Sequence, residues 1–364
     1  MSKKDKEFSK FKINRRGVLK AIVAGSAAVT STVNTVAKPS SQVTPDYGKG
    51  MYAVITGSGS ALPDPQRGNA SQAIVVDGTI LQFDCGRRTM DNLMQAGINP
   101  LHVDYIFFTH LHFDHIATYD YYVITSWIAG RQKPYKVFGP EGTSSMSDGA
   151  INHMHRMDSD FVKELVKTWP KEGTSTRPVP EAPVVVKDVG PGTIVETEDF
   201  KVTAVNTPHV KLFQLKSLGY RVDSKYGSVV ISGDTAPSSA LVKLAEGADL
   251  LIHECVVPDF GMTHTGKFSL RRGMQRLEDD TDKPRTGHTS PSELGRLAQK
   301  AGVKKVVATH LPPYTSVQAA VDFSSLYYGE SPGPQIWGEF VSAIKKHYDG
   351  PVILAEDAMV LKLG

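Results

Sequence analysis

Short runs of apolar, β-branched and aromatic residues recur along the chain, and each has the length of a buried strand. Asp77-Gly78 separates two of these runs and is typical of a tight hairpin turn. A second hairpin is predicted at 220–231, with its turn at 224–227. The other predicted strands lie at 51–56, 71–76, 79–83, 103–108, 183–187, 200–205, 249–252, 303–308 and 351–354.

Helical segments alternate with these strands. Residues 88–96 are predicted to form a helix that ends at Gly97, because glycine readily takes the left-handed conformation at a helix end. Further helices are predicted at 116–129, 159–169, 238–245, 290–301 and 336–348. Two blocks of strands, each followed by helices, predict an α/β (α+β) fold with two similar halves packed face to face. The similar apolar segments 106–111 and 306–311, which both end in Thr-His-Leu, agree with this division.

Composition divides the chain further. Residues 38–50 contain Pro, Ser and Gly and predict a linker, so the folded domain is expected at 51–364. Within that domain, 142–182 lacks the strand pattern, and it is predicted with 257–287 to be an insertion.

Positive charge is concentrated before the domain. The chain has 41 Lys and Arg against 38 Asp and Glu, a formal net charge of +3. Residues 1–37 hold eight of the basic residues and two of the acidic ones, so the remainder carries 33 and 36, a net charge of −3. The remainder therefore has no overall positive charge that would attract nucleic acid.

The N-terminal segment resembles an export signal. Asn14 to Lys20, with Arg15 and Arg16, is similar to the twin-arginine motif, and a weakly apolar stretch leads to a small-residue cleavage site at Ala37. We expect 1–37 to engage the twin-arginine export machinery, which would make the protein periplasmic or secreted. The apolar stretch is short for a stable membrane span. An amphipathic or membrane-anchoring helix is the alternative.

Cys85 and Cys255 are the two cysteines of the chain, and each follows a predicted strand. They could pair in an oxidising compartment. Their positions at strand ends favour two small, half-buried thiols instead.

A dense cluster of metal-ligand residues follows the buried strand 103–108. His110, His112, Asp114 and His115 fall within six positions. Neutral imidazole and carboxylate groups bind zinc and related divalent metals. The cluster therefore predicts a metal site at a sheet edge, and the strand before it disfavours a His-rich surface turn.

Three further ligand-type residues occupy the same kind of position. His209 follows the strand 200–205, Asp234 follows the hairpin that ends at Ile231, and His310 follows the strand 303–308.

The HxHxDH motif at 110–115, together with these three positions, resembles the metallo-β-lactamase superfamily from about Tyr52 to the C-terminus. The resemblance implies a four-layer αββα sandwich with a binuclear metal site at one edge between the sheets. It implies two metal sets with Asp234 as the bridge between them: His110, His112 and His209, and Asp114, His115 and His310. Zinc is the default divalent ion, with iron or manganese as alternatives.

Within the superfamily, residues 253–255 and 288–290 resemble motifs of the ribonuclease Z and arylsulfatase-like branch. This likeness implies that His288, oriented by Glu254, protonates the leaving oxygen; a purely structural Glu–His hydrogen bond is the alternative. Asp84 matches a strand-end aspartate that orients the metal loop. Asp114 could assist as a base, although metal ligation would compete with that role.

The leading hypothesis is an exported binuclear hydrolase, in which a metal-bridging hydroxide attacks a small anionic ester, either a sulfate ester or a phosphodiester. The two insertions are its candidate substrate walls and lid. The alternatives are a lactonase or β-lactamase-type acyl hydrolase, a ribonuclease Z-like endonuclease, and a metal-binding scaffold. The leader and the charge of −3 disfavour nucleic acid as a partner. A homodimer is left open.

The remaining basic side chains are given no catalytic role. His153 and His155 are predicted at the surface, and His102, His264 and His347 are interpreted as non-catalytic. Arg271, Arg272 and Arg276 are predicted on an exposed helix face, with a basic lip for an anionic substrate as the alternative.

Overall fold

The computed structural model describes residues 46–168, 180–209, 216–256, 287–328 and 333–364. These residues belong to one unit, Thr44–Gly364, by their contacts. Several predictions lie outside the described residues: the leader 1–37, the first part of the linker, nearly all of the 257–287 insertion, His264, Arg271, Arg272 and Arg276. None of the helices in the described ranges has the length and apolar character that a membrane crossing requires.

The first sheet has seven strands in the order β14-β1-β2-β3-β4-β5-β6. β2 and β3 are the predicted hairpin, and Asp77 and Gly78 turn it with φ angles of 44° and 83°, as a type I′ turn requires. The strands are β1 (Met51–Gly57), β2 (Ser71–Val76), β3 (Thr79–Phe83), β4 (Tyr105–Phe107), β5 (Tyr135–Gly139), β6 (Val184–Asp188) and β14 (Val360–Leu363).

The second sheet has seven strands in the order β13-β12-β11-β10-β9-β8-β7. β9 and β10 are the second predicted hairpin. The strands are β7 (Gly192–Glu196), β8 (Phe200–Asn206), β9 (Leu218–Ser224), β10 (Gly227–Ile231), β11 (Leu250–Glu254), β12 (Val306–Thr309) and β13 (Val352–Leu354).

The two sheets repeat one pairing pattern, which confirms the prediction of two similar halves. Antiparallel β1-β2-β3 continue into parallel β4, β5 and β6, and antiparallel β8-β9-β10 continue into parallel β11, β12 and β13. In this pattern β4 corresponds to β11, whereas β12 corresponds to β5. The similar segments 106–111 and 306–311 lie on β4 and β12, so their use as a mark of the repeat was wrong.

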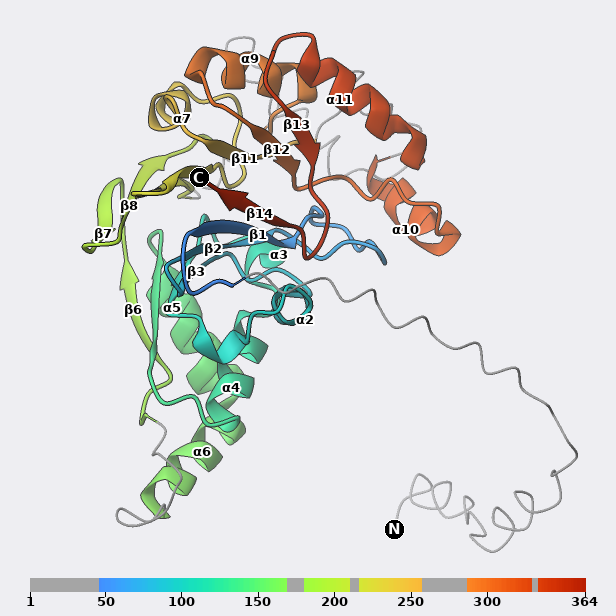
Figure 1. Ribbon diagram of the computed structural model, residues 1–364. Coiled ribbons are helices and arrows are strands. Elements are labelled where there is room, and N and C mark those ends of the chain that lie inside the picture. The colour runs from blue at the N-terminus through green and yellow to red at the C-terminus, as the bar shows by residue number, and fades with distance from the viewer. Residues whose placement is uncertain (1–45, 169–179, 210–215, 257–286, 329–332) are drawn as a thin grey trace, which may run out of the picture. The chain divides into compact units, whose positions relative to one another are not determined.

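Helices cover the outer face of each sheet and complete the predicted four-layer αββα sandwich (Figure 1). One hydrophobic cluster joins α2, α4 and α6 to the first sheet, and another joins α7, α9 and α11 to the second. The helices are α2 (Thr89–Gln95), α3 (Phe113–Ile116), α4 (Tyr119–Ile128), α5 (Thr143–Asp148), α6 (Arg156–Thr168), α7 (Ser239–Leu244), α9 (Pro291–Ala301), α10 (Gln318–Tyr328) and α11 (Trp337–Lys345), with shorter helical turns η3 (Pro100–His102), η4 (Gly149–Met154) and η6 (Pro334–Ile336).

A third cluster fills the space between the two sheets. The rings of Phe83 and Phe107 stack with their centroids 4.9 Å apart, and Tyr220 of the opposite sheet contacts both. Aromatic pairs of this kind add to the stability that area burial supplies. The aromatic layer fixes the distance between the sheets and therefore the position of the loops at their shared edge.

Several elements were not predicted: β5, β7, β14, α3, α5 and α10. β7 has mostly exposed or half-buried residues at a sheet edge, so it lacks the continuous apolar run by which buried strands are recognised. β14 is half-exposed and pairs with β1, which lies some 300 residues earlier in the chain.

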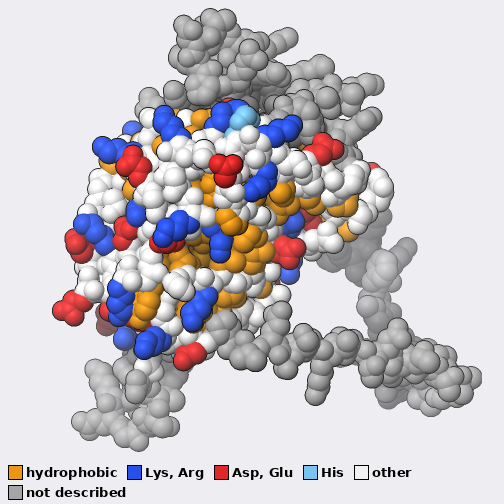
Figure 2. Space-filling view, turned by 45° about the horizontal axis from the view of Figure 1, so that its top comes forward, with side chains coloured by type: hydrophobic (Ala, Val, Ile, Leu, Met, Phe, Trp, Pro, Cys, Tyr) orange, Lys and Arg blue, Asp and Glu red, His pale blue; other side chains and the backbone are white. Residues whose placement is uncertain are grey.

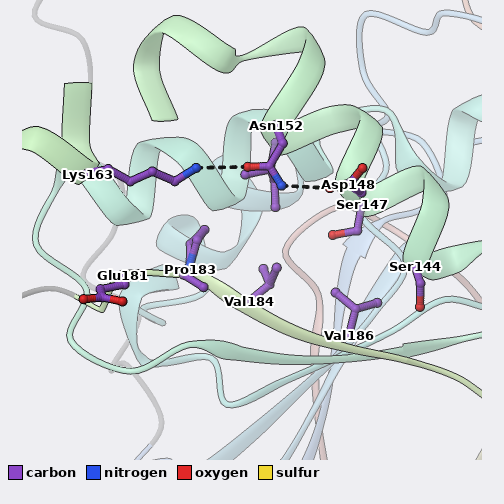
Figure 3. Close-up of a pocket in the computed structure, with 11 residues that line it drawn as sticks. Ser144, Ser147, Asp148, Asn152, Lys163, Glu181, Pro183, Val184 and Val186 are labelled. Atoms are coloured by element: carbon purple, nitrogen blue, oxygen red, sulfur yellow. Dashed lines mark hydrogen bonds between the residues drawn. The ribbon is translucent and has the colours of Figure 1, made fainter. Parts of the chain in front are cut away.

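The predicted insertion 142–182 folds into α5, η4 and α6 in its described part. A cavity of about 290 Å³ lies between these helices and the edge strand β6. Figure 3 shows the side chains around it, where Lys163 donates to Asn152 (3.2 Å) and Asn152 donates to Asp148 (2.9 Å). His153 is exposed and faces Asp148, so its predicted surface position is confirmed. His155 is half-buried, with 30% of its side chain exposed, and lies 2.8 Å from Asp120.

One carboxylate, Asp357, joins the two ends of the domain. It accepts hydrogen bonds from the Ser58 N–H (3.0 Å) and hydroxyl (2.8 Å), the Gly68 N–H (2.7 Å) and the Asn92 amide (2.7 Å). The Ser58 carbonyl in turn accepts from the Leu311 N–H at 3.0 Å. Asp357 thereby holds the 58–68 loop against the residue that follows His310.

Replacing this carboxylate should cost substantial stability. Asp357→Ala leaves four donors without their acceptor, and we expect the free energy of unfolding to fall by about 3 kcal/mol in urea denaturation. The control is Asp349→Ala at an exposed position, which should change it by less than about 0.5 kcal/mol. Equal losses in the free energy of unfolding for the two substitutions would contradict the role of Asp357 in holding the 58–68 loop.

Candidate metal centre

The predicted site residues gather at one edge of the sandwich because each follows a strand that ends there. Asp84 follows β3, the cluster 110–115 follows β4, Asp234 follows β10, Glu254 ends β11 and His310 follows β12. Within each sheet these strands are parallel to one another: β3 pairs with β4, and β11 pairs with both β10 and β12. Carboxyl ends of parallel strands meet at a common edge, where ligand sites form in open α/β sheets.

The first predicted donor set converges on a point. Nδ1 of His112 lies 2.9 Å from Nε2 of His110 and 3.1 Å from Nε2 of His209. Oδ2 of Asp234 lies 3.8 Å from the Nε2 atoms of both His110 and His209. One donor atom from each of the four residues therefore falls within 4.8 Å of the others.

The second predicted set is as compact. Oδ2 of Asp114 lies 3.5 Å from Nε2 of His115 and 3.2 Å from Nε2 of His310. Oδ1 of Asp234 lies 3.4 Å from His115 Nε2, and its Oδ2 lies 3.3 Å from His310 Nε2. Asp234 thus faces both sets, which is the arrangement that the bridging role requires.

The donor atoms fit divalent cations. Among the described residues, His115 Nε2 and Asp234 Oδ1 are buried side-chain atoms without a hydrogen-bond partner, and such atoms are costly unless something binds them. Nitrogens that face one another across about 3 Å also need a proton or a cation between them. The geometry therefore suits metal ions better than hydrogen bonds among the residues alone.

The electrostatics agree with this fit. Burial lowers the pKa of His209 to about 4, and burial with the nearby charge of His115 holds the pKa of His110 well below its usual value. Both imidazoles are therefore neutral, which is the form that binds metals. Burial also disfavours charge on His115, but Asp234, Asp114 and Asp84 outweigh it and raise the pKa of that histidine. The three carboxylates therefore strongly favour a positive charge close to His115.

Asp84 lies where a residue that orients the metal loop should be. Its Oδ1 accepts from the Thr109 N–H at 2.8 Å, and its Oδ2 accepts from the Thr109 hydroxyl at 2.8 Å. The same Oδ2 lies 2.8 Å from Nδ1 of His115. The carboxylate therefore leaves Nε2 of His115 to face the donor set. Thr109 was not singled out from the sequence, because a threonine before a histidine carries no signal of its own.

The backbone around the site takes left-handed conformations. Asp84 has φ 57° and His310 has φ 53°, values that are uncommon outside glycine and that concentrate at functional sites. Gly233 has φ 58°, and a Cβ there would lie 2.7 Å from Cβ of Thr109. The turn before Asp234 therefore needs glycine to pass this close to the metal loop.

Glu254 and His288 form the predicted pair. Oε1 of Glu254 lies 3.0 Å from Nδ1 of His288 and accepts from the N–H groups of Thr235 and Thr289, both at 3.1 Å. Burial alone would lower the pKa of His288. The negative charges of Glu254 and Asp234 outweigh this effect and raise the pKa to about 9. Nδ1 of His288 lies 3.9 Å from Asp234 Oδ2, so the pair stands directly beside the donor sets.

A second orienting group was missed in the sequence. The Gly287 carbonyl lies 2.8 Å from Nδ1 of His209, which leaves Nε2 of this histidine for the first donor set. This segment therefore positions two histidines of the site. The Gly287 carbonyl contacts His209, and the Thr289 N–H binds Glu254, which contacts His288. α9 begins directly after them with a capping box between Ser290 and Glu293.

The other sequence predictions near the site have clear outcomes. Cys85 and Cys255 do not form a disulfide, as the sequence favoured, but both thiols are fully buried and not half-buried as predicted. His347 is exposed beside Arg296, and His102 is exposed on η3, away from the donor sets as expected.

Comparison with known proteins agrees with this geometry. Residues 82–311, which include both donor sets, match the family described as the beta-lactamase superfamily domain. A ribonuclease Z from Methanothermobacter thermautotrophicus is 28% identical over 306 residues, covering 72% of this chain and 86% of that protein.

Two solved structures share the fold. The short form of human tRNase Z has a TM-score of 0.55 and 22% identity, covering 86% of this chain and 99% of its own. Zn²⁺-bound PqqB from Methylobacterium extorquens has a TM-score of 0.52 and 16% identity, covering 86% of this chain and 100% of its own. At these identities the likeness supports the fold.

The role of Asp84 can be tested by metal affinity. Asp84→Asn keeps the size of the side chain but removes the charge that holds His115 and Thr109, and we expect affinity for zinc to fall about 10- to 100-fold in chelator competition. Asp223→Asn, on β9 and half-exposed, is the matched control and should leave affinity unchanged. Unaltered affinity in a folded Asp84→Asn protein would contradict the orienting role.

Proposed function

The chain belongs to the beta-lactamase superfamily, and on this premise we propose that it is a binuclear metal-dependent phosphodiesterase. It is a hydrolase of the metallo-β-lactamase fold, as its sequence predicted. The observation that supports the proposal best is the carboxylate of Asp234, which faces two complete sets of metal-ligand side chains. We assign His110, His112 and His209 to one ion, Asp114, His115 and His310 to the other, and Asp234 to both.

Each group of the site has a task in phosphodiester cleavage. Two divalent ions, when bound, supply an activated water and offset the charge on the phosphate. Glu254 holds Nδ1 of His288, so we assign proton delivery to Nε2 of that residue. His288 is 26% exposed, and a leaving oxygen can therefore approach it. Asp114 is directed at His115 and His310, which favours metal ligation over a role as base.

Zinc is the metal that we propose, because five imidazoles and two carboxylates suit it and because the fold occurs with zinc in PqqB. Iron and manganese remain the alternatives for the same donors.

The relatives favour RNA as the substrate over the small ester that ranked first from the sequence. Relatives that match 71% and 72% of this chain carry the name ribonuclease Z. A small phosphodiester is the second candidate, because the chain beyond the leader has a net charge of −3. Basic and acidic side chains are also interspersed on the face shown in Figure 2. A sulfate ester and an acyl substrate have no support among these relatives.

We also propose that residues 1–37 are a twin-arginine signal and that the mature protein is periplasmic or secreted, on the motif around Arg15 and Arg16. An exported enzyme would meet extracellular or periplasmic nucleic acid and small phosphodiesters. The homodimer and the roles of the two insertions as substrate wall and lid stay predictions.

Ester preference tests the reaction class. The zinc-loaded protein should hydrolyse bis(p-nitrophenyl) phosphate and leave p-nitrophenyl sulfate at the background rate. Asp234→Ala should lower kcat/KM for the phosphodiester about 100-fold or more, because both donor sets lose their shared ligand. Faster turnover of the sulfate, or full activity in Asp234→Ala, would contradict the proposal. Cleavage of a short single-stranded RNA, measured in parallel, would place RNA ahead of small diesters.

The proton-delivery role of His288 predicts a dependence on the leaving group. An RNA alkoxide needs a proton and p-nitrophenolate does not, so His288→Gln should lower kcat about 100-fold or more on RNA and far less on the nitrophenyl ester. His155→Gln, a surface histidine paired with Asp120, is the control. Equal losses on the two substrates would show that the Glu254–His288 pair only supports the loop.

A further inference from the structure

One residue between the predicted ligands has no part in holding metal. Phe113 stands between His112 and Asp114 and begins the short helix α3. Its side chain is 66% exposed, whereas Asp114 and His115, which follow it, are buried. A large apolar side chain with this exposure is common at scattered surface positions, but Phe113 lies directly between two predicted metal ligands.

The residues of the site differ in how far they are buried. His110, Asp114, His115, Asp234 and His310 are all less than 5% exposed. His112 is only partly buried, and His288 is 26% exposed. A substrate therefore reaches the donor sets from the side of His112 and His288. Phe113 is joined to His112 by a peptide bond, so its backbone borders this entrance, and its side chain is exposed to solvent.

The ring is also carried on a fixed backbone. The His112 carbonyl accepts hydrogen bonds from the N–H groups of His115 (3.0 Å) and Ile116 (3.3 Å), and the His115 carbonyl accepts from the Cys85 N–H (2.7 Å). The backbone on both sides of Phe113 is thus tied to the donor sets and to the strand end at Asp84. A rigid aromatic side chain gives contact area with little loss of conformational freedom on binding.

We propose that Phe113 is a specificity-determining residue that stacks on a planar ring of the substrate, either a nucleobase or an aryl group, next to the phosphate. The proposal rests on the proposed phosphodiesterase function and narrows its substrate class to diesters with an aromatic ring beside the scissile bond. Every base has a π-face, so a single phenyl ring selects for a base without reading its identity. Stacking with good geometry corresponds to about a 2- to 10-fold gain in affinity over apolar contact of equal area.

Calorimetric binding of two phosphonates to the zinc-loaded protein tests this directly. Phenylphosphonate and cyclohexylphosphonate carry the same anion and six-membered rings, but only phenyl is planar and aromatic. Wild type should bind phenylphosphonate about fivefold more tightly. Phe113→Tyr should keep this preference, and Phe113→Leu should abolish it while binding of methylphosphonate stays the same. Phe161→Leu replaces a phenylalanine of similar exposure on α6 and should behave as wild type.

Each outcome decides the question. A preference for the phenyl compound that disappears only in Phe113→Leu supports the stacking role. Equal affinities in wild type, or a preference that survives in Phe113→Leu, overturns it. Turnover of methyl p-nitrophenyl phosphate, measured on the same proteins, reports on the phosphodiesterase function separately: its absence in wild type would overturn that function, whereas the two phosphonate affinities would still decide the role of Phe113.

Discussion

Burial of charge between two sheets is the constraint on which this structure depends. Asp114 and Asp234 are both less than 5% exposed and face imidazoles that are almost as deeply buried. Carboxylates without compensation are strongly destabilising in such a place. Neighbouring histidines offset part of the charge, and divalent ions between the donor sets would offset the rest. Bound divalent ions would therefore stabilise the fold, and the loops have to hold the donor atoms in place.

The two halves of the sandwich meet this requirement in related ways. Each half sends parallel strands to the same edge, and a buried carboxylate at a strand end organises the following loops. Asp84 does so after β3, where it binds Thr109 and His115. Glu254 does so at the end of β11, where it binds His288 and two backbone N–H groups. Asp357, at the far end of the chain, ties the loop beside His310 to the first sheet. Among the described residues of the site, His112 and His288 stay partly exposed.

Much of this could be predicted because the sequence pattern and the chemistry coincide. Apolar runs predicted the central strands, and the ligand residues after them predicted a metal site. The resemblance to the superfamily implied how these residues divide into two donor sets. Edge strands such as β7 were not predicted, because their exposed residues interrupt the apolar pattern. The groups that orient the ligand residues were not predicted for a different reason. Thr109 and the Gly287 carbonyl act through backbone or hydroxyl contacts between segments that are distant in the sequence. Asp357 meets Ser58 across 299 positions, a contact that only the folded chain reveals. The repeat of the halves lies in strand pairing, and so the short likeness of 106–111 and 306–311 was misleading.

The central claim is that two ions share the Asp234 carboxylate. Anomalous X-ray scattering from zinc-loaded crystals measures this most directly, because each ion gives its own peak. Two peaks are expected per chain, one among His110, His112 and His209 and one among Asp114, His115 and His310, with an oxygen of Asp234 about 2.0–2.2 Å from each. A single peak, or two peaks of which one does not contact Asp234, would contradict the binuclear site.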